Sequence, residues 1–558
     1  MKTELEQAIT ASVKELFGLD VSVELTRPEE QFGDYATNVA LQLSKQAGKN
    51  PREVAEGLAV RIRDSLAEKV ASVSVAGPGF LNLTLTESAL LAAAKADLPK
   101  PLTGQKWVLE YSDPNPFKPL HAGHLYTTLV GDTISRLVER AGAETIRINY
   151  GGDVGLHVGR SMWGIVNNLG GELPEKLANI PEAERPSWMG ARYVEGTTAD
   201  EDGRTTHDEV IAMNKRVYQV HADNDHESPF AQIYWTCRQW SYDYFPELYK
   251  QLKVKQFDRY IPESEITPPG IQAVTEQLAK GVYEESDGAV VFKGEPYGLH
   301  TRVFINGHGL PTYEAKEVGL ILTKWRDYQF DRSIIITANE IEQYMAVVYK
   351  SIEQFEPELV NRSAHLVHGL VKLQGGIKMS SRKGNIITAL DILQAARDAG
   401  AETGTNPSEE TILAAVKYAF AKNRIGGDIA YDPKESVALE GNSGPYLQYA
   451  HARARSILAK AGEQAGAELT GLEPDERSLL RKVTEYTEVV ERATNELMPH
   501  HICTYLYELA QKFNQFYEHN RVIGSGEREA PRLTLVRHYA DTLRNGLELL
   551  GIAAPERM

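Results

Sequence analysis

The 558-residue chain has little cysteine, no long apolar run and a deficit of positive charge. Its two cysteines, Cys237 and Cys503, are far apart in sequence, which excludes a disulfide scaffold and a four-thiolate metal site. No apolar run approaches the roughly 18 residues that a membrane span needs, and no secretory signal is found, so we expect a cytoplasmic protein without a membrane partner. Sixty Lys and Arg against 77 Asp and Glu give a net charge of −17, which argues against a generally basic surface but leaves room for local basic patches.

Length and patterning predict an α/β protein with three domains. Residues 1–100, here called the N-terminal module, combine an amphipathic first helix with alternating strands, which predicts a small α+β domain. Residues 101–407, the central domain, are predicted to form a Rossmann-like parallel sheet, interrupted at about 155–300 by an insertion that does not continue the sheet. Residues 408–558, the C-terminal bundle, have strong helical stripes and few glycines, which predicts an all-α domain.

A βαβ unit opens the central domain. An apolar strand at Trp107–Tyr111 is followed by a proline-rich loop, a helix at His124–Arg140 and a second strand that ends at Gly151-Gly152-Asp153. In such a unit a ligand binds at the carboxyl ends of the strands. After the insertion the sheet is expected to resume in three strands, at residues 303–305, 333–337 and 366–373.

The loop between the first strand and its helix carries the sequence His121-Ala122-Gly123-His124. A helix N-terminus offers unpaired N–H groups and a positive dipole end, which favour a phosphate. Gly123 would let a nucleotide approach closely, and the two imidazoles could donate hydrogen bonds to charge that develops on phosphorus. The histidines could instead cap the helix or lie on the surface, but the strand–loop–helix context favours phosphate binding.

A second loop carries Lys378-Met379-Ser380-Ser381-Arg382-Lys383-Gly384, and the stretch from Val371 to Asn385 has four basic residues and no acidic one. A glycine-flanked loop with lysines and hydroxyls is suited to bind a polyphosphate and close over it. The alternative is a solvated basic turn.

A histidine metal site is a further alternative, because His365-Leu366-Val367-His368 provides a second pair of histidines. In a predicted strand, His365 and His368 point to opposite faces, and zinc sites usually add cysteine or carboxylate ligands. We therefore predict no metal site formed by the protein itself.

Together, the His-Ala-Gly-His and Lys-Met-Ser-Ser-Arg sequences resemble the two signature motifs of class I aminoacyl-tRNA synthetases. Longer stretches in all three predicted domains resemble the arginyl-tRNA synthetase family in particular. These stretches are residues 33–38, 112–125, 439–453 and 549–552.

This resemblance implies ATP-dependent attachment of L-arginine to tRNA(Arg) through an arginyl-adenylate, with release of AMP and pyrophosphate and with Mg²⁺ bound to the ATP. It implies catalytic roles for His121, His124 and Lys378. The implied ATP-binding residues are His121, Gly123, His124, His368, Lys378, Met379, Ser380 and Ser381. The implied arginine-binding residues are Glu110, Asp113, Asn115, Tyr313 and Glu317. Glu317 replaces the usual aspartate of the family, and Asp113 replaces a frequent serine.

For the tRNA, the resemblance implies that the C-terminal bundle binds the anticodon and that the N-terminal module contacts the outer corner of the RNA. On the helix that starts near Pro445, Gln448, His451 and Arg455 share a polar face. The expected tRNA-binding residues are Phe32, Asn38, Gln448, His451, Arg455 and Tyr517. Further candidates are Tyr505, Phe513 and Phe516 for base stacking, although each aromatic is more often a core residue, and Arg532, Arg537 and Arg544 for phosphates.

The alternatives to this interpretation are another class I synthetase, a smaller nucleotidyltransferase with the same histidine loop, and an RNA-binding relative without catalytic activity. The three predicted domains and the long arginine-type stretches disfavour the smaller nucleotidyltransferase, and the two intact phosphate motifs disfavour the relative without catalytic activity. We expect a monomer.

Overall fold

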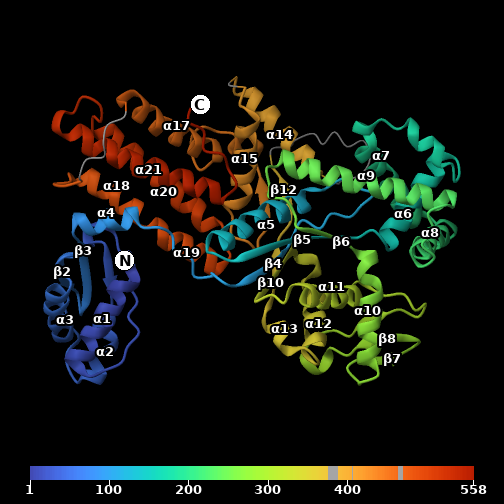
Figure 1. Cartoon of the computed structure of the whole chain (residues 1–558), viewed down its shortest axis with the longest axis horizontal. Coiled ribbons are helices and arrows are strands. Elements are labelled where there is room, and N and C mark those ends of the chain that lie inside the picture. Colours follow the sequence, from blue (N-terminus) through green and yellow to red (C-terminus); the bar gives the residue numbers. More distant parts are fainter. Residues whose placement is uncertain (375–386, 405, 463–468) are drawn as a thin grey trace.

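The computed structural model places the N-terminal module beside the C-terminal bundle, with the central domain on the other side of that bundle (Figure 1). It describes residues 1–374, 387–404, 406–462 and 469–558, with the backbone alone at 202, 204 and 205.

The N-terminal module packs helices against a small antiparallel sheet with the strand order β1-β3-β2. Leu81, Leu83 and Leu85 alternate along β3 and are buried, so one face of the sheet forms the core of the module. The strands are β1 (Tyr35–Thr37), β2 (Val70–Ala76) and β3 (Phe80–Leu85), and the helices are α1 (Lys2–Phe17), α2 (Val39–Ala47), α3 (Pro51–Ser65) and α4 (Glu87–Lys95).

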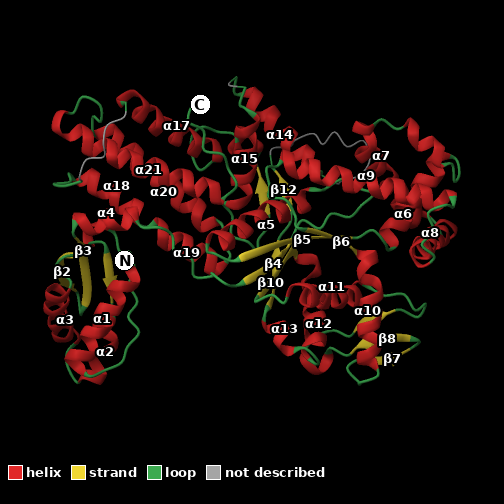
Figure 2. Cartoon of the chain, viewed as in Figure 1, coloured by secondary structure: helices red, strands yellow, loops and turns green. Residues whose placement is uncertain are grey.

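A parallel sheet with the strand order β11-β10-β4-β5-β6 lies at the centre of the central domain (Figure 2). Its strands are β4 (Lys106–Glu110), β5 (Glu144–Gly151), β6 (Arg259–Pro262), β10 (Arg332–Ala338) and β11 (Ser363–His368). Helix α5 (Ala122–Arg140) connects β4 to its parallel neighbour β5, which confirms the predicted βαβ unit. The carboxyl ends of β4, β5 and β10 therefore meet at one edge of the sheet.

Two sheet predictions were wrong. Residues 303–305 belong to β9 (Arg302–Ile305), which pairs antiparallel with β8 (Ala289–Phe292) and β8 with β7 (Glu284–Ser286), in a sheet of their own. Conversely, β6 lies in the region predicted to be outside the main sheet, yet it pairs parallel with β5. Both errors have one cause, since a short apolar strand does not reveal which sheet it will join.

Helices surround the sheet and make up most of the remaining chain. Those of the central domain are α6 (Leu156–Leu169), α7 (Arg185–Asp202), α8 (Arg204–Ala222), α9 (Pro229–Gln251), α10 (Glu263–Leu278), α11 (Tyr313–Tyr328), α12 (Glu342–Glu353), α13 (Pro357–Asn361) and α14 (Ala389–Glu402). A third sheet prediction was also wrong: residues 366–373 do not form one strand of the main sheet. Residues 371–373 form β12 (Val371–Leu373), which pairs with β13 (Ile429–Tyr431) in a separate sheet. Among the helices of the described residues, none is both long enough and apolar enough to cross a membrane.

The C-terminal bundle consists of packed helices, as predicted, except that strand β13 also lies within residues 408–558 and pairs with β12. On α17, Leu447, Ala450, Ala454 and Ile457 form the expected buried stripe. The helices are α15 (Glu409–Ala421), α16 (Pro433–Ser436), α17 (Gly444–Ala461), α18 (Pro474–Thr484), α19 (Tyr486–Glu496), α20 (His500–His519) and α21 (Glu529–Leu549).

Candidate active site

His121 caps the N-terminus of α5 at the carboxyl edge of the parallel sheet. Its Nδ1 accepts hydrogen bonds from the backbone N–H groups of Gly123 (3.1 Å) and His124 (3.3 Å). Because Nδ1 accepts, the proton of the neutral ring is assigned to Nε2, which is left to donate. The rings of His121 and His124 are stacked with their centroids 3.6 Å apart, so both histidines belong to one small site.

Both histidines are uncharged in the free protein. Burial, followed by the charges of Lys118 and His368, lowers the pKa of His121 to about 4. Burial, with His121 as the next cause, lowers the pKa of His124 well below its ordinary value. Within the described chain, His124 Nδ1 is buried without a hydrogen-bond partner. The helix N-terminus therefore presents neutral imidazoles, one with an unused polar atom, where a phosphate would be favoured.

Gly123 has no room for a side chain. A Cβ at this position would lie 2.9 Å from His121 Cε1, so the glycine makes space for the capping ring as well as for a ligand. The chain that follows residue 386 is bound to the same helix start, since Ala122 N donates to Ile387 O (2.8 Å) and Ala389 N donates to Leu120 O (2.8 Å). Lys378, Met379, Ser380 and Ser381 lie outside the described residues.

His368 contacts α5, and both of its ring nitrogens already have partners within the protein. This corrects the expectation that His368 binds ATP. It is 1% exposed. Its Nδ1 donates to Gly369 O (2.9 Å), and its Nε2 accepts from the hydroxyl of Thr127 on α5 (2.7 Å). His365 points the other way, with Nε2 2.6 Å from Thr337 Oγ1. Across the described residues, no group of three or more His, Cys, Asp or Glu is arranged to hold a metal ion.

Three of the expected arginine-binding residues are carboxylates that the structure gathers into one cluster, here called the acidic pocket: Glu110 and Glu317, which are buried, and Asp113, which is half-buried. Burial, followed by the charge of Glu110, raises the pKa of Glu317 to about 8. The same two causes raise the pKa of Asp113 well above its ordinary value, although its Oδ1 accepts a hydrogen bond from Tyr150 N (2.8 Å).

The acidic pocket has more negative than positive groups. Lys324 forms a buried ion pair with Glu110, so that carboxylate already has a cationic partner. By contrast, Glu317 Oε2 is buried and has no hydrogen-bond partner among the described residues. A buried carboxylate without a partner is costly, so this arrangement fits a ligand that brings its own cation.

Asn115 and Tyr313 lie at the edges of this site. Asn115 Oδ1 fills the space beside Gly152 at the end of β5, because a Cβ on Gly152 would lie 2.4 Å from it. Tyr313 is the first residue of α11 and is 53% exposed, one helical turn before the buried Glu317.

Sequence reasoning missed a second polar group next to Asn115, formed by Glu263, Lys316 and His157. Glu263 and Lys316 form a buried ion pair, and Lys316 Nζ also donates to Tyr218 Oη (2.8 Å). His157 Nε2 lies 2.7 Å from Gly152 O, and burial with nearby cations lowers its pKa to about 3. The one sequence feature that could have indicated this group is the position of Lys316 directly before Glu317.

Sequence models of three protein families match consecutive parts of the chain. The arginyl tRNA synthetase N-terminal domain matches residues 3–85, the catalytic domain of the class I (R) tRNA synthetases residues 86–431, and the DALR anticodon-binding domain residues 447–558. The catalytic model alone spans more than half of the chain. The chain belongs to the arginyl-tRNA synthetase family.

Individual relatives agree along their whole lengths. The chain is 31% identical to the arginine–tRNA ligase of Frankia casuarinae over 100% of this chain and 98% of that one. It is 29% identical to the Porphyromonas gingivalis enzyme over 100% and 99%. The solved structure of Thermus thermophilus arginyl-tRNA synthetase superposes with a TM-score of 0.81 at 26% identity, covering 100% of both chains. The predicted family and fold class are thus confirmed.

In this member of the arginyl-tRNA synthetase family, the N-terminal module has an open cavity of about 490 Å³. Two exposed aromatics, Phe32 (49% exposed) and Phe80 (42% exposed), line it together with Asn38 and Gln42. Gln42 Nε2 donates to Asn38 Oδ1 (2.9 Å), so the amide side chains form one polar wall beside the aromatic rings. We call this cavity the Phe32 pocket; it contains both residues that were expected to contact tRNA here.

The expectations for the C-terminal bundle need correction. Gln448 and His451 are 0% exposed, because Gln448 Nε2 donates to Ala553 O (2.8 Å) and His451 Nδ1 lies 2.9 Å from Pro555 O. Their face of α17 binds the C-terminal segment of the chain, and Arg455 pairs with Glu556 in that segment (2.7 Å).

The other candidates of the bundle are divided between core and surface. Tyr505, Phe513 and Phe516 are buried core residues, and Arg532 is buried in ion pairs with Glu473 and Glu476. Tyr517 remains half-buried with the guanidinium of Arg453 4.7 Å above its ring, so it is still partly accessible to a base.

Proposed function

We propose that this chain joins L-arginine to tRNA(Arg) at the expense of ATP, through an arginyl-adenylate and with release of pyrophosphate and AMP. The observation that carries the choice of amino acid is Glu317, whose buried Oε2 lacks a partner in the described chain and whose pKa is raised to about 8. A guanidinium carries a permanent charge and a fork of N–H donors that matches a carboxylate. Glu317 would bind it, with Asp113 beside it and Tyr313 at the entrance.

In the first step, the carboxylate of arginine attacks the α-phosphorus of ATP in line. A carboxyl oxygen–phosphorus bond forms and the bond to pyrophosphate breaks, so the protein has to position the reactants and stabilise the charge that spreads over the phosphate. His121 Nε2–H supplies a donor for this charge at the positive end of α5, whose own first N–H groups already donate to His121 Nδ1 and to Ile387 O. The pKa values of both histidines are lowered, chiefly by burial, and each neutral ring keeps one N–H with which it can donate a hydrogen bond.

In the second step, a ribose hydroxyl at the end of the tRNA attacks the carbonyl carbon of the adenylate, and AMP leaves. Lys378 is proposed to hold the pyrophosphate released in the first step. In support, the chain on the carboxyl side of the lysine loop is hydrogen-bonded to the start of α5, next to His121. Mg²⁺ would enter on the phosphates of ATP.

Recognition of the tRNA is proposed to divide among the three domains. Residues 1–100 would contact the outer corner of the RNA through the Phe32 pocket, whose aromatic rings and amides suit a splayed base. Residues 101–407 would hold the acceptor end at the active site, and residues 408–558 would bind the anticodon, with Tyr517 as a stacking candidate. The enzyme is proposed to act as a cytosolic monomer.

The direct test is to supply the purified protein with ATP, Mg²⁺, tRNA and each labelled amino acid in turn. Charging by arginine alone is expected, and the arginine-dependent exchange of pyrophosphate into ATP should accompany it. Charging by a different amino acid, or by none with folded protein and cognate tRNA, would overturn the assignment.

A further inference from the structure

We propose that Asp34 is a positioning residue for tRNA binding. Together with Arg477 and Arg481 it fixes the position of the Phe32 pocket relative to the C-terminal bundle, so that both can contact the same tRNA molecule. We call these three residues the clasp. The proposal rests on the proposed function, because it explains how two separate contact surfaces act on one RNA.

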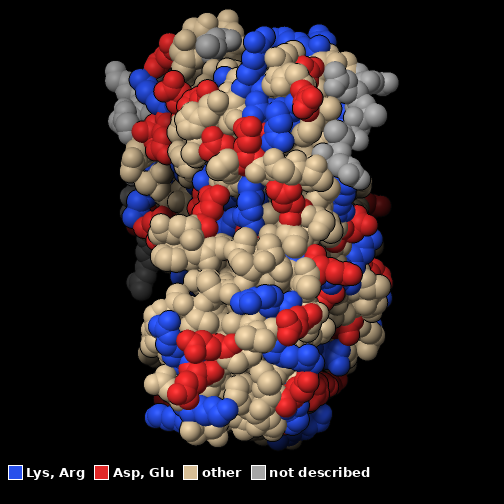
Figure 3. All heavy atoms as spheres, turned by 90° about the vertical axis from the view of Figure 1, so that its left-hand side faces the viewer, with Lys and Arg blue, Asp and Glu red and all other residues tan. Residues whose placement is uncertain are grey.

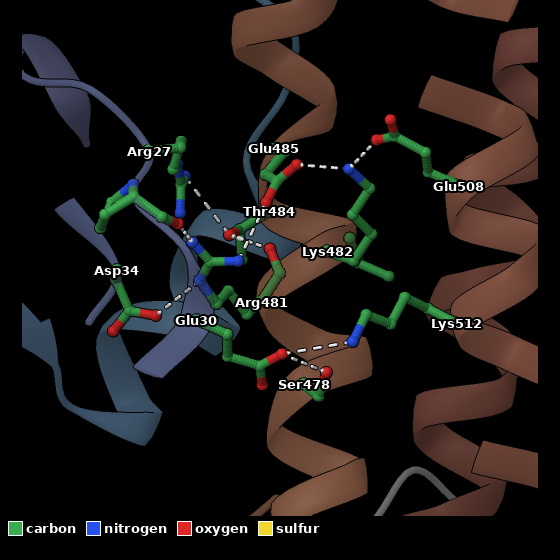
Figure 4. Close-up of polar contacts among 12 residues, drawn as sticks. Arg27, Glu30, Asp34, Ser478, Arg481, Lys482, Thr484, Glu485, Glu508 and Lys512 are labelled. Atoms are coloured by element: carbon green, nitrogen blue, oxygen red, sulfur yellow. Dashed lines mark hydrogen bonds and ion pairs between the residues drawn. The ribbon is translucent and has the colours of Figure 1, made fainter. Parts of the chain in front are cut away.

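The clasp joins the N-terminal module to helix α18 through a fully buried carboxylate (Figure 4). Asp34 is 0% exposed, and its Oδ2 accepts from Arg477 Nη2 (2.6 Å), while its Oδ1 lies 3.4 Å from Arg481 Nε. Arg481 Nη2 in turn donates to Pro28 O (2.7 Å). Within its own module, Asp34 Oδ2 accepts from Leu85 N (2.7 Å), so the carboxylate ties strand β3 to the neighbouring helix.

Further polar contacts flank the clasp on both sides. Glu488 Oε1 of α19 accepts from Arg27 Nη2 and from the hydroxyl of Tyr35, each at 2.6 Å. Glu30 accepts from Ser478 Oγ at 2.8 Å and pairs with Lys512 at 3.3 Å (Figure 4). The segment between Arg27 and Tyr35, which includes the buried Asp34, therefore contacts the bundle at several points.

The same segment forms a wall of the Phe32 pocket. Phe32 lies two residues before Asp34 and points outward, whereas Asp34 points into the interface. Gly33 makes this reversal possible: its φ is +109°, and a Cβ there would lie 2.8 Å from Leu83 O. One short turn thus presents Asp34 to the bundle on one side and Phe32 to the pocket on the other.

The surface charge indicates why such rigidity matters. On the face formed by the N-terminal module and the bundle, Lys and Arg are interspersed with Asp and Glu and do not gather into a single basic patch (Figure 3). Binding to RNA on this face must then combine separate modest contacts. Two contacts on one ligand reinforce each other when their spacing is fixed, because the second one forms at a high effective concentration.

The experiment is a double-mutant cycle on the KM for tRNA(Arg) in aminoacylation, using the full-length enzyme. Asp34→Asn and Phe32→Ala are each expected to raise this KM by about tenfold, with kcat unchanged. If the clasp acts through the pocket, the double variant should show no larger increase than the stronger single variant, since the contact is lost once only. Glu15→Gln is the matched control, because Glu15 pairs with Arg61 on the exposed surface of the same module.

Arg477→Gln opens the clasp from the bundle side and should reproduce the effect of Asp34→Asn, which keeps the test valid if one variant folds poorly. Circular dichroism and arginine-dependent pyrophosphate exchange at saturating tRNA monitor the fold and the chemistry. A tRNA KM at the wild-type value in both variants would overturn the proposal, as would effects that multiply in the double variant. Failure of the wild-type enzyme to charge tRNA with arginine would instead overturn the proposed function.

Discussion

The clasp and the acidic pocket each contain a buried carboxylate, and the two carboxylates differ in their partners. In the clasp, Asp34 is fully buried but faces two guanidinium groups of a neighbouring helix. In the acidic pocket, Glu317 Oε2 is buried and, as far as the chain is described, faces no donor, and its pKa is raised to about 8. Burial of a charge is tolerated when the protein supplies its partner. The difference indicates that a buried carboxylate with cationic partners stabilises the fold, whereas a buried carboxylate without a partner is available to bind a ligand.

The largest effect is expected where another buried polar atom lacks a partner, at His124. His124→Ala should lower the rate of arginyl-adenylate formation by about 10²- to 10³-fold, because it removes a group aimed at the developing charge. The protein should remain folded, since His124 Nδ1 makes no hydrogen bond to the described residues that could be lost. Pyrophosphate exchange measures the rate, and His519→Ala, at an exposed histidine of α20 that pairs with Asp475, is the control. A normal exchange rate would remove His124 from the mechanism.

The second-largest effect on activity is expected from Glu317→Gln. It is expected to raise the KM for arginine by about 30- to 100-fold, because it leaves the substrate guanidinium in a buried site without its charged partner. The KM for ATP should change little, since the proposed ATP site lies at the start of α5. Steady-state exchange kinetics with each substrate varied in turn measure both constants. Equal losses for arginine and ATP would mean that Glu317 acts on the structure of the whole site.

The arginine KM should also depend on pH. The proposed function has arginine bind the ionised form of Glu317. Because the pKa of Glu317 is raised to about 8 in the free enzyme, most molecules carry the proton at pH 6. The KM for arginine should therefore fall roughly tenfold for each pH unit between 6 and 7.5 and level off above 8. The Gln variant should lack this dependence. A flat profile in the wild-type enzyme would show that the carboxylate is already ionised before arginine binds.

The two buried acids should respond to neutralisation with opposite signs. Asp34→Asn is expected to lower the free energy of unfolding by about 1–2 kcal/mol, because it leaves two guanidinium groups without their carboxylate. Glu317→Gln should raise it by about 1 kcal/mol near pH 8, because it removes an uncompensated buried charge.

The pH dependence of that gain has a defined sign. Since the folded pKa of Glu317 lies above the ordinary value of 4.5, the wild-type protein loses stability as pH rises from there to about 8. The gain from glutamine should accordingly vanish below pH 4.5. Thermal unfolding without ligands measures both variants, and a loss of stability in both would break the contrast between the two regions.

Much of the arrangement of the candidate active site could be predicted from sequence. The strand, proline loop and helix around His121 have clear periodicities and a short spacing, so both the βαβ unit and the position of the histidines followed. The acidic pocket followed because Tyr313 and Glu317 share a helix face and the resemblance marked the residues after β4. The pairing of Glu110 with Lys324 was not predictable, since 214 residues separate them.

The bundle shows where sequence reasoning stops. A helix face with Gln448, His451 and Arg455 has the same spacing whether it contacts RNA or another part of the chain. Here it contacts the segment from Ala553 to Glu556, which could not be foreseen because that segment has no periodicity of its own. The role of His368 was hidden for a similar reason, because its partner Thr127 lies on a different element.

The smallest expected effect separates the two roles of His121, which caps α5 and also presents Nε2 to the site. Asparagine is a good helix N-cap, whereas alanine cannot accept the two backbone hydrogen bonds. His121→Asn should therefore be more stable than His121→Ala by about 1 kcal/mol, a typical capping contribution. Both variants lack the imidazole donor, so both should lose adenylate formation to the same extent. If asparagine restored stability and activity together, the cap alone would explain the histidine, and the phosphate contact would have to come from His124 and the helix N-terminus.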